Sequence, residues 1–188
     1  MTDILCPVLE LSVIIPGILL AYLPVKNYLR QTPLKLTAWL LPLLLGICIL
    51  GGAVCCALQI PTRWFLFPLL PVIMLIYHKT LKISVWKSVS IFLAVFAVFT
   101  CVKSLSRAVN ALMTADLHIT ENELWFRTGA GIFYNLICLL FVLAAWYPAR
   151  HCVQTMIADE NFAQTWYVFW ILPVIFIGVN LFYDSQTP

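Results

Sequence analysis

The sequence predicts an all-α, polytopic membrane helical bundle that forms a single domain over residues 1–188. Three observations predict it. Hydrophobic residues make up 63% of the chain and charged residues 10%, and the mean hydropathy of +0.98 lies far outside the range of soluble domains. The apolar residues form runs close to the ~20 residues that a helix needs to cross a bilayer. None of these runs alternates with period two, which argues against barrel strands.

Six apolar runs qualify as transmembrane helices. They cover residues 5–25, 36–58, 60–77, 85–110, 125–146 and 166–183. The third run is the weakest, because it carries Pro68 and Pro71 and reaches eighteen residues only when it begins at Ile60. Pro16 and Pro24 are expected to bend the first helix or to end it. Tryptophan and tyrosine occur at several ends of the runs, where their amphipathic rings favour the membrane interface.

Lysine and arginine predict the orientation of the bundle. Seven of the eleven follow odd-numbered runs, namely Lys26, Arg30, Lys35, Lys79, Lys82, Lys87 and Arg150. The other four, on the opposite side, are Arg63, Lys103, Arg107 and Arg127. Because basic loops are retained in the cytoplasm, we expect the first group inside and both termini outside the cytoplasm, including the tail from Asp184 to Pro188. A re-entrant third run would move three of the seven outside, so we expect it to cross.

Composition also argues against several functional classes. The net charge of +3 is small and the basic residues form short clusters between apolar runs, so nucleic acid is not expected as a partner. The seven cysteines include no CxxC pair with a partner pair, and we expect neither a zinc site nor any cofactor. The N-terminus "MTDILCP" lacks the basic start of a detachable signal peptide. Gly-rich phosphate loops, paired catalytic carboxylates and kinase motifs are missing, so the chain by itself shows no enzyme.

The stretch "CVKSLSRAVN" holds the most informative polar cluster. Lys103, Arg107 and Asn110 recur at i, i+4 and i+7 and therefore share one helix face. Lys103 follows Lys87 by sixteen residues, or about 24 Å of helix, which places it near the outer rim of the hydrocarbon. Two interpretations stay open: snorkelling to outer headgroups, or a cationic wall of a ligand pocket open to the outside. Glu10, near the outer end of the first run, either reaches water or pairs with Lys103 or Arg107.

The longest outer loop, "MTADLHITENELW", precedes Arg127, which we count among the candidate ligand contacts. Thr120 and Glu123 fit a capping box that begins the fifth helix. His118 lies beside carboxylates, and it is either a metal ligand, a pH sensor or a solvated loop histidine.

The last inner loop contains the pair His151 and Cys152. Adjacent helical residues point about 100° apart, so this pair does not form a nucleophile with its base. Val153, Met156 and Ile157 instead predict a short amphipathic segment that lies on the inner membrane surface.

Three stretches, in this order along the chain, carry a resemblance to a known family: "SVIIPGILLAYLPVKNYLR", "IPTRWFLFPLLPVIMLIYHKTLKISVWKSVSIFLAVFA" and "TWYVFWILPVIFIGVNLFY". Together they resemble the N-terminal membrane region of GHKL-type sensor histidine kinases of Clostridia and related gut bacteria, which are similar in plan to the peptide-sensing receptors of quorum-sensing systems. The resemblance covers nearly all of residues 1–183. It implies a location in the bacterial cytoplasmic membrane and a role in a two-component system. Such proteins continue into a seventh helix, a dimerisation helix and an ATP-binding domain, none of which is present here. We therefore expect either a sensor portion cut before its last helix or a stand-alone relative, without kinase activity of its own.

The expected function is that of a membrane sensor or receptor for an extracellular signal, such as a small peptide or an amphipathic molecule. The expected ligand contacts are Glu10, Lys103, Arg107, Asn110 and Arg127. The expected partners are the lipid bilayer, this ligand and a second copy of the chain as a homodimer.

Two alternatives remain. A small transporter or channel is disfavoured because no inverted repeat is visible and there is little mid-bilayer polarity beyond Asn135 and Asn180. Asn180 is near an end of its run, and Asn135 is expected to form a hydrogen bond between helices. A membrane cysteine peptidase that processes signalling peptides needs a cysteine–histidine pair at the inner face. Its candidates are His78, His151 and Cys152, and the Gly-x-His-Ala motif of that family is missing.

Overall fold

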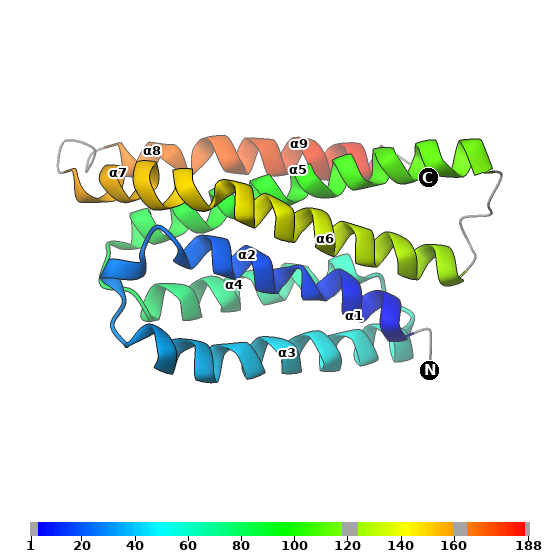
Figure 1. Ribbon diagram of the computed structural model, residues 1–188, viewed down its shortest axis with the longest axis horizontal. Helices are drawn as coiled ribbons and strands as arrows, with labels where there is room; N and C mark the ends of the chain where they lie inside the picture. The colour runs from blue at the N-terminus through cyan, green and yellow to red at the C-terminus, as the bar shows by residue number, and fades with distance from the viewer. Residues whose placement is uncertain (1–3, 118–123, 160–164, 187–188) are drawn as a thin grey trace.

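The helices run back and forth along one long axis, as the computed structural model of the chain shows (Figure 1). The structure describes residues 4–117, 124–159 and 165–186. It describes their side chains except at positions 63, 67, 107–117, 124–127, 167 and 180–186. The elements in chain order are α1 (Leu5–Ser12), α2 (Ile14–Tyr22), the 3-10 turn η2 (Lys26–Tyr28), α3 (Pro33–Leu58), α4 (Thr62–Lys79), α5 (Val85–Leu117), α6 (Leu124–Pro148), the π-helical η3 (Ala149–Val153), α7 (Gln154–Ala158), α8 (Trp166–Phe169) and α9 (Ile171–Gln186). Within this part of the chain the regular structure is helical apart from one isolated β-bridge.

Among the described residues, four segments are long and apolar enough to cross a membrane: Leu5–Tyr22, Pro33–Leu58, Val85–Ser106 and Thr128–Ala158. They correspond to the first, second, fourth and fifth predicted spans. The third predicted span forms α4, whose apolar part, Trp64–Lys79, is shorter. The sixth forms the short helices α8 and α9. The all-helical class is confirmed, and the number of six spans stays a prediction.

Prolines explain where two of the helical passes are interrupted. Pro16 has no N–H to offer the carbonyl of Ser12, and α1 ends at Ser12. Pro173 in the same way leaves the carbonyl of Phe169 without its helical partner, and α8 ends at Phe169. The expectation that Pro16 disturbs the first helix is confirmed.

The fifth helix continues well beyond its predicted end at residue 146. It runs through η3 and α7 as far as Ala158. The amphipathic segment predicted at the inner membrane surface is part of this run, and its apolar face packs against the protein. Ile157 is buried, and Val153 and Met156 pack against the protein core, because their apolar face meets neighbouring helices.

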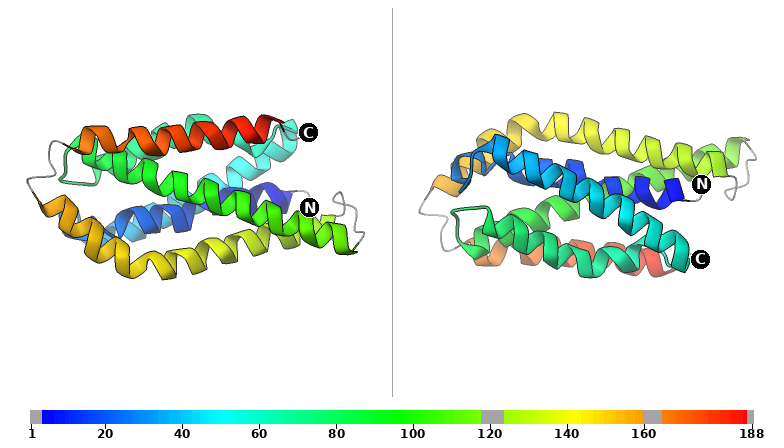
Figure 2. Two further views of the ribbon diagram at one scale, coloured as in Figure 1. Left: turned by 90° about the horizontal axis from the view of Figure 1, so that it is seen from above. Right: turned by 90° about the horizontal axis from the view of Figure 1, so that it is seen from below.

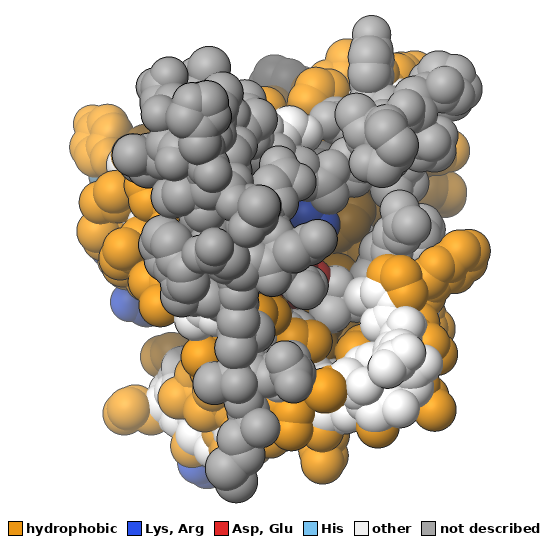
Figure 3. Space-filling model, turned by 90° about the vertical axis from the view of Figure 1, so that its right-hand side faces the viewer, with side chains coloured by type: hydrophobic (Ala, Val, Ile, Leu, Met, Phe, Trp, Pro, Cys, Tyr) orange, Lys and Arg blue, Asp and Glu red, His pale blue; other side chains and the backbone are white. Residues whose placement is uncertain are grey.

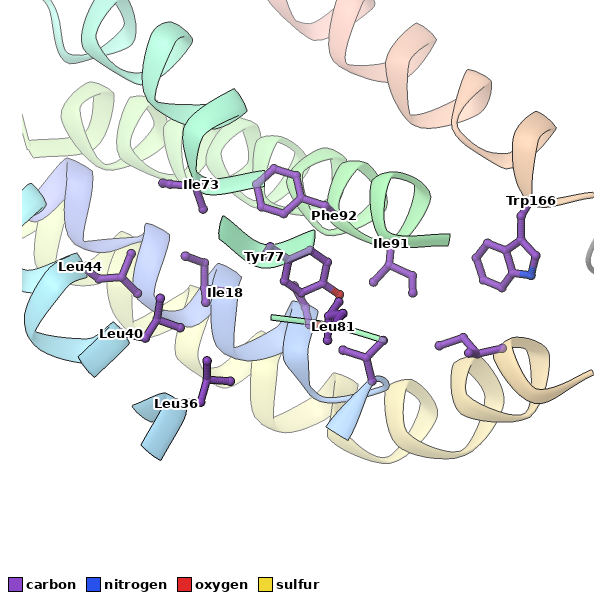
Figure 4. Packing of buried hydrophobic residues seen from close by; sticks show 13 residues of the cluster. Ile18, Leu36, Leu40, Leu44, Ile73, Tyr77, Leu81, Ile91, Phe92 and Trp166 are labelled. Atoms are coloured by element: carbon purple, nitrogen blue, oxygen red, sulfur yellow. The ribbon is translucent and has the colours of Figure 1, made fainter. Parts of the chain in front are cut away.

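Two clusters of buried side chains hold the helices together. The first surrounds Tyr77, whose hydroxyl donates to the carbonyl of Ala21 at 2.8 Å, and it draws on α2, α3, α4 and α5 (Figure 4). The second joins α2, α5 and α6 through residues such as Phe99 and Val142. Large apolar side chains point outward from the helices, for example Leu172, which is 77% exposed. Such exposure of apolar side chains suits helices that face lipid.

Candidate functional site

The two ends of the bundle differ in charge, and both ends of the described chain lie at the same one of them. The first and last described residues lie at one end, which we call the terminal end (Figures 1 and 2). The opposite end contains the turn η2, the starts of α3 and α5, the end of α4 and η3. We call it the basic end, because all seven residues of the predicted inner group belong to it: Lys26, Arg30, Lys35, Lys79, Lys82, Lys87 and Arg150.

The terminal end holds the predicted ligand contacts. Glu10 is exposed on α1, and its carboxylate accepts a hydrogen bond from the hydroxyl of Thr62 at the start of α4. Lys103 is half-buried on α5. Figure 3 looks onto this end, where Lys or Arg atoms and Asp or Glu atoms are visible near the centre among hydrophobic side chains. The side chains of Arg107, Asn110 and Arg127 lie outside the described residues, as do His118 and the capping box.

Sequence reasoning missed Thr62 as the partner of Glu10. A threonine at a helix start is ordinarily explained as a local cap. Its contact with α1 depends on how α1 and α4 pack, which the local sequence does not encode.

A polar seam between α1 and α6 lies next to Glu10 along α1. The amide nitrogen of Asn135 donates to the carbonyls of Leu9 and Gly131, both at 2.9 Å. The hydroxyl of Ser12 donates to Asn135 Oδ1 at 2.8 Å. The prediction that Asn135 forms a hydrogen bond between helices is confirmed. The amide thus joins two helices and is not presented to a substrate.

A clasp between two loops organises the basic end. Leu29 and Leu81 form the isolated antiparallel bridge. The N–H of Arg30 donates to the carbonyl of Thr80 at 2.9 Å, and that of Lys82 donates to the carbonyl of Tyr28 at 2.8 Å. The loop after α2 is therefore tied to the loop after α4, whereas hydrophobic periodicity gives no signal for such a loop pairing.

The histidine and cysteine side chains at the basic end have separate contacts. His78 Nδ1 lies 3.0 Å from the hydroxyl of Ser88, and the His151 ring packs at a tilt of 40° against Tyr147 with centroids 4.6 Å apart. Cys152 is exposed and, among the described contacts, meets neither histidine. Groups of three or more His, Cys, Asp or Glu suited to a metal are not found among the described residues.

A wholly apolar pocket of about 210 Å³ opens between α2 and α6. Its walls include Ile15 and Leu19 from α2, and Leu139 and Trp146 from α6. With no polar group to orient a solute, it suits hydrocarbon rather than a polar substrate.

These features define an all-helical protein with several helices apolar enough to cross a bilayer. No protein-family model matches the chain, and comparisons with curated proteins and with solved structures give no match.

Proposed function

We propose that the chain is the membrane sensor region of a receptor of the GHKL histidine-kinase type. It detects an extracellular signal, such as a small peptide or an amphipathic molecule, at the terminal end of the bundle. The signal favours one packing of the helices over another, and a following helix of the parent receptor relays the shift inward.

The central position of α5 is the observation that carries this proposal. α5 contains Lys103 and packs against α2, α4, α6, α8 and α9. A ligand that displaces α5 at the terminal end must therefore change the packing of most of the bundle. Such a shift requires different ligand affinities for the two packings, which is the property expected of a sensor.

The proposed orientation has six crossings, with the basic end in the cytoplasm and both termini outside. The clustering of seven cations at one end supports it, because basic loops stay on the cytoplasmic side. In this orientation the terminal end faces the medium, where an extracellular ligand reaches Glu10, Lys103, Arg107, Asn110 and Arg127.

The test joins the chain to the seventh helix and catalytic region of a receptor kinase that drives a reporter gene, with conditioned medium as the source of signal. We expect Lys103→Gln combined with Arg107→Gln to raise the half-maximal dose of medium by about thirtyfold, because each removed charge weakens an anionic or polar contact by roughly 1 kcal/mol. Membrane insertion of this variant should be unchanged.

The matched control is Lys26→Gln combined with Lys35→Gln, which removes the same charge at the basic end. Its dose response should equal that of the parent chimaera. An unchanged dose response in the Lys103 and Arg107 variant would remove these residues from the site.

A further inference from the structure

Two cations at the basic end are brought together by backbone pairing. The bridge between Leu29 and Leu81 places Arg30 and Lys82 directly after its two paired positions. Arg30 Nε also donates to the carbonyl of Leu81 at 2.7 Å. That carbonyl belongs to the peptide bond that joins Leu81 to Lys82, so the Arg30 guanidinium lies against the backbone of the next cation.

Charge repulsion between this pair is not relieved within the described part of the chain. Both residues are exposed, and neither side chain contacts a carboxylate there. The bond from Nε orients the guanidinium and leaves its two terminal nitrogens available. A planar fork of this kind, beside a lysine ammonium, matches the oxygens of a phosphate group.

Exposed apolar side chains follow the two cations within a few residues of the chain. The indole nitrogen of Trp39 donates to the side-chain oxygen of Gln31 at 3.2 Å. Because Gln31 directly follows Arg30 in the chain, this bond holds the indole close to that cation. Leu34, in the first turn of α3, is 81% exposed, and Trp86 at the start of α5 is 53% exposed. Tryptophan rings favour the boundary between headgroups and hydrocarbon.

We propose that Arg30 and Lys82 form a binding site for the phosphate of an anionic phospholipid, with its acyl chains against α3. The exposed apolar side chains that follow the cations favour a lipid over a free phosphate, which gains nothing from Trp39 or Leu34. The site goes beyond the proposed sensing function and lies at the opposite end of the bundle. Its assignment to the inner leaflet rests on the proposed orientation, whereas binding itself does not.

Native mass spectrometry of the chain in detergent tests the site. Phosphatidylglycerol, phosphatidylcholine with the same acyl chains, and inorganic phosphate are titrated separately. We expect the chain to retain phosphatidylglycerol preferentially. Arg30→Gln combined with Lys82→Gln should weaken that affinity by about twenty-fivefold, because each cation near an anionic lipid contributes roughly a fivefold factor.

The matched control is Lys26→Gln combined with Lys35→Gln, which removes the same charge from the same end outside the bridge and should weaken affinity by about twofold. Lys82→Gln alone serves as a variant that should fold normally, because the Lys82 side chain has no hydrogen bond among the described contacts. It should weaken the affinity for phosphatidylglycerol by about fivefold. Equal losses in the two double variants would overturn the site in favour of a diffuse basic surface. Equal retention of phosphatidylcholine, or displacement of the lipid by an equal concentration of inorganic phosphate, would overturn the lipid assignment.

Discussion

Asn135 is the residue whose role the sequence and the structure agree on most closely. Its amide donates to the carbonyls of Leu9 and Gly131 and accepts from Ser12, so it joins α6 to α1. Replacement by leucine keeps the size and removes these bonds. We expect Asn135→Leu to lower the free energy of unfolding by about 1–2 kcal/mol, the range for polar contacts between membrane helices. Reversible unfolding in mixed micelles measures it.

Thr37→Ala is the control for this prediction. Among the described residues, the Thr37 hydroxyl bonds only to carbonyls of its own helix, those of Pro33 and Leu34, so its removal should change stability by less than about 0.5 kcal/mol. A stability of Asn135→Leu equal to that of the wild type would show that the seam does not hold α1 to α6.

At the residue scale, the sequence predicted the kind of interaction that a polar side chain forms better than it predicted which residue the side chain contacts. An asparagine within an apolar run must satisfy its amide, so an interhelical bond for Asn135 followed from its position alone. Glu10 was placed correctly near an end, but its partner Thr62 was not foreseen, because that contact joins residues fifty-two positions apart. The placement of the Lys103 side chain relative to Glu10 depends likewise on packing between helices.

At the element scale, the spacing of α1 and α3 depends on a glycine. A Cβ atom at Gly52 would lie 2.4 Å from Val8 Cγ2 and 3.0 Å from the backbone nitrogen of Val8. Since backbone cannot rotate away, α1 and α3 must separate to admit a methyl group. We expect Gly52→Ala to lower the free energy of unfolding by about 1–3 kcal/mol, measured by the same unfolding assay.

Gly46→Ala provides a control on the same helix. A Cβ atom there meets nothing within 4 Å. The substitution should therefore be neutral or stabilise the helix by up to about 1 kcal/mol through propensity alone. If both variants behaved alike, helix propensity rather than close approach would explain the role of Gly52.

Element boundaries could be predicted where a proline determines them. Pro16 disturbs the first pass, as expected, because it removes a helical hydrogen bond. The continuation of α6 beyond residue 146 was not foreseen. Pro148 and the polar residues after it resemble a helix end, yet the π-helical turn η3 carries the helix on, and Ile157 becomes buried in the core.

At the scale of the whole molecule, the fold class followed from composition, whereas the arrangement of the helices did not. The length of the apolar runs is enough to predict helices, because a chain segment in hydrocarbon must form all its backbone hydrogen bonds internally, as a helix does. Which helices touch depends on side-chain fit over long separations, as in the burial of Trp166 against the cluster around Tyr77. The pairing of the loops at Leu29 and Leu81 is of the same kind.

The orientation of the bundle makes a prediction for the whole molecule. Cys152 is exposed in η3 at the basic end, and Ile60 is exposed between α3 and α4 at the terminal end. Two variants are made, one with Cys152 as its single cysteine and one with Ile60→Cys as its single cysteine. In intact spheroplasts, a membrane-impermeant maleimide should label the Ile60→Cys variant. It should label Cys152 only after permeabilisation, because the basic end stays in the cytoplasm. The reverse labelling pattern would show that the bundle has the opposite orientation. Glu10 and Lys103 would then lie on the inner side, where an extracellular signal does not reach them.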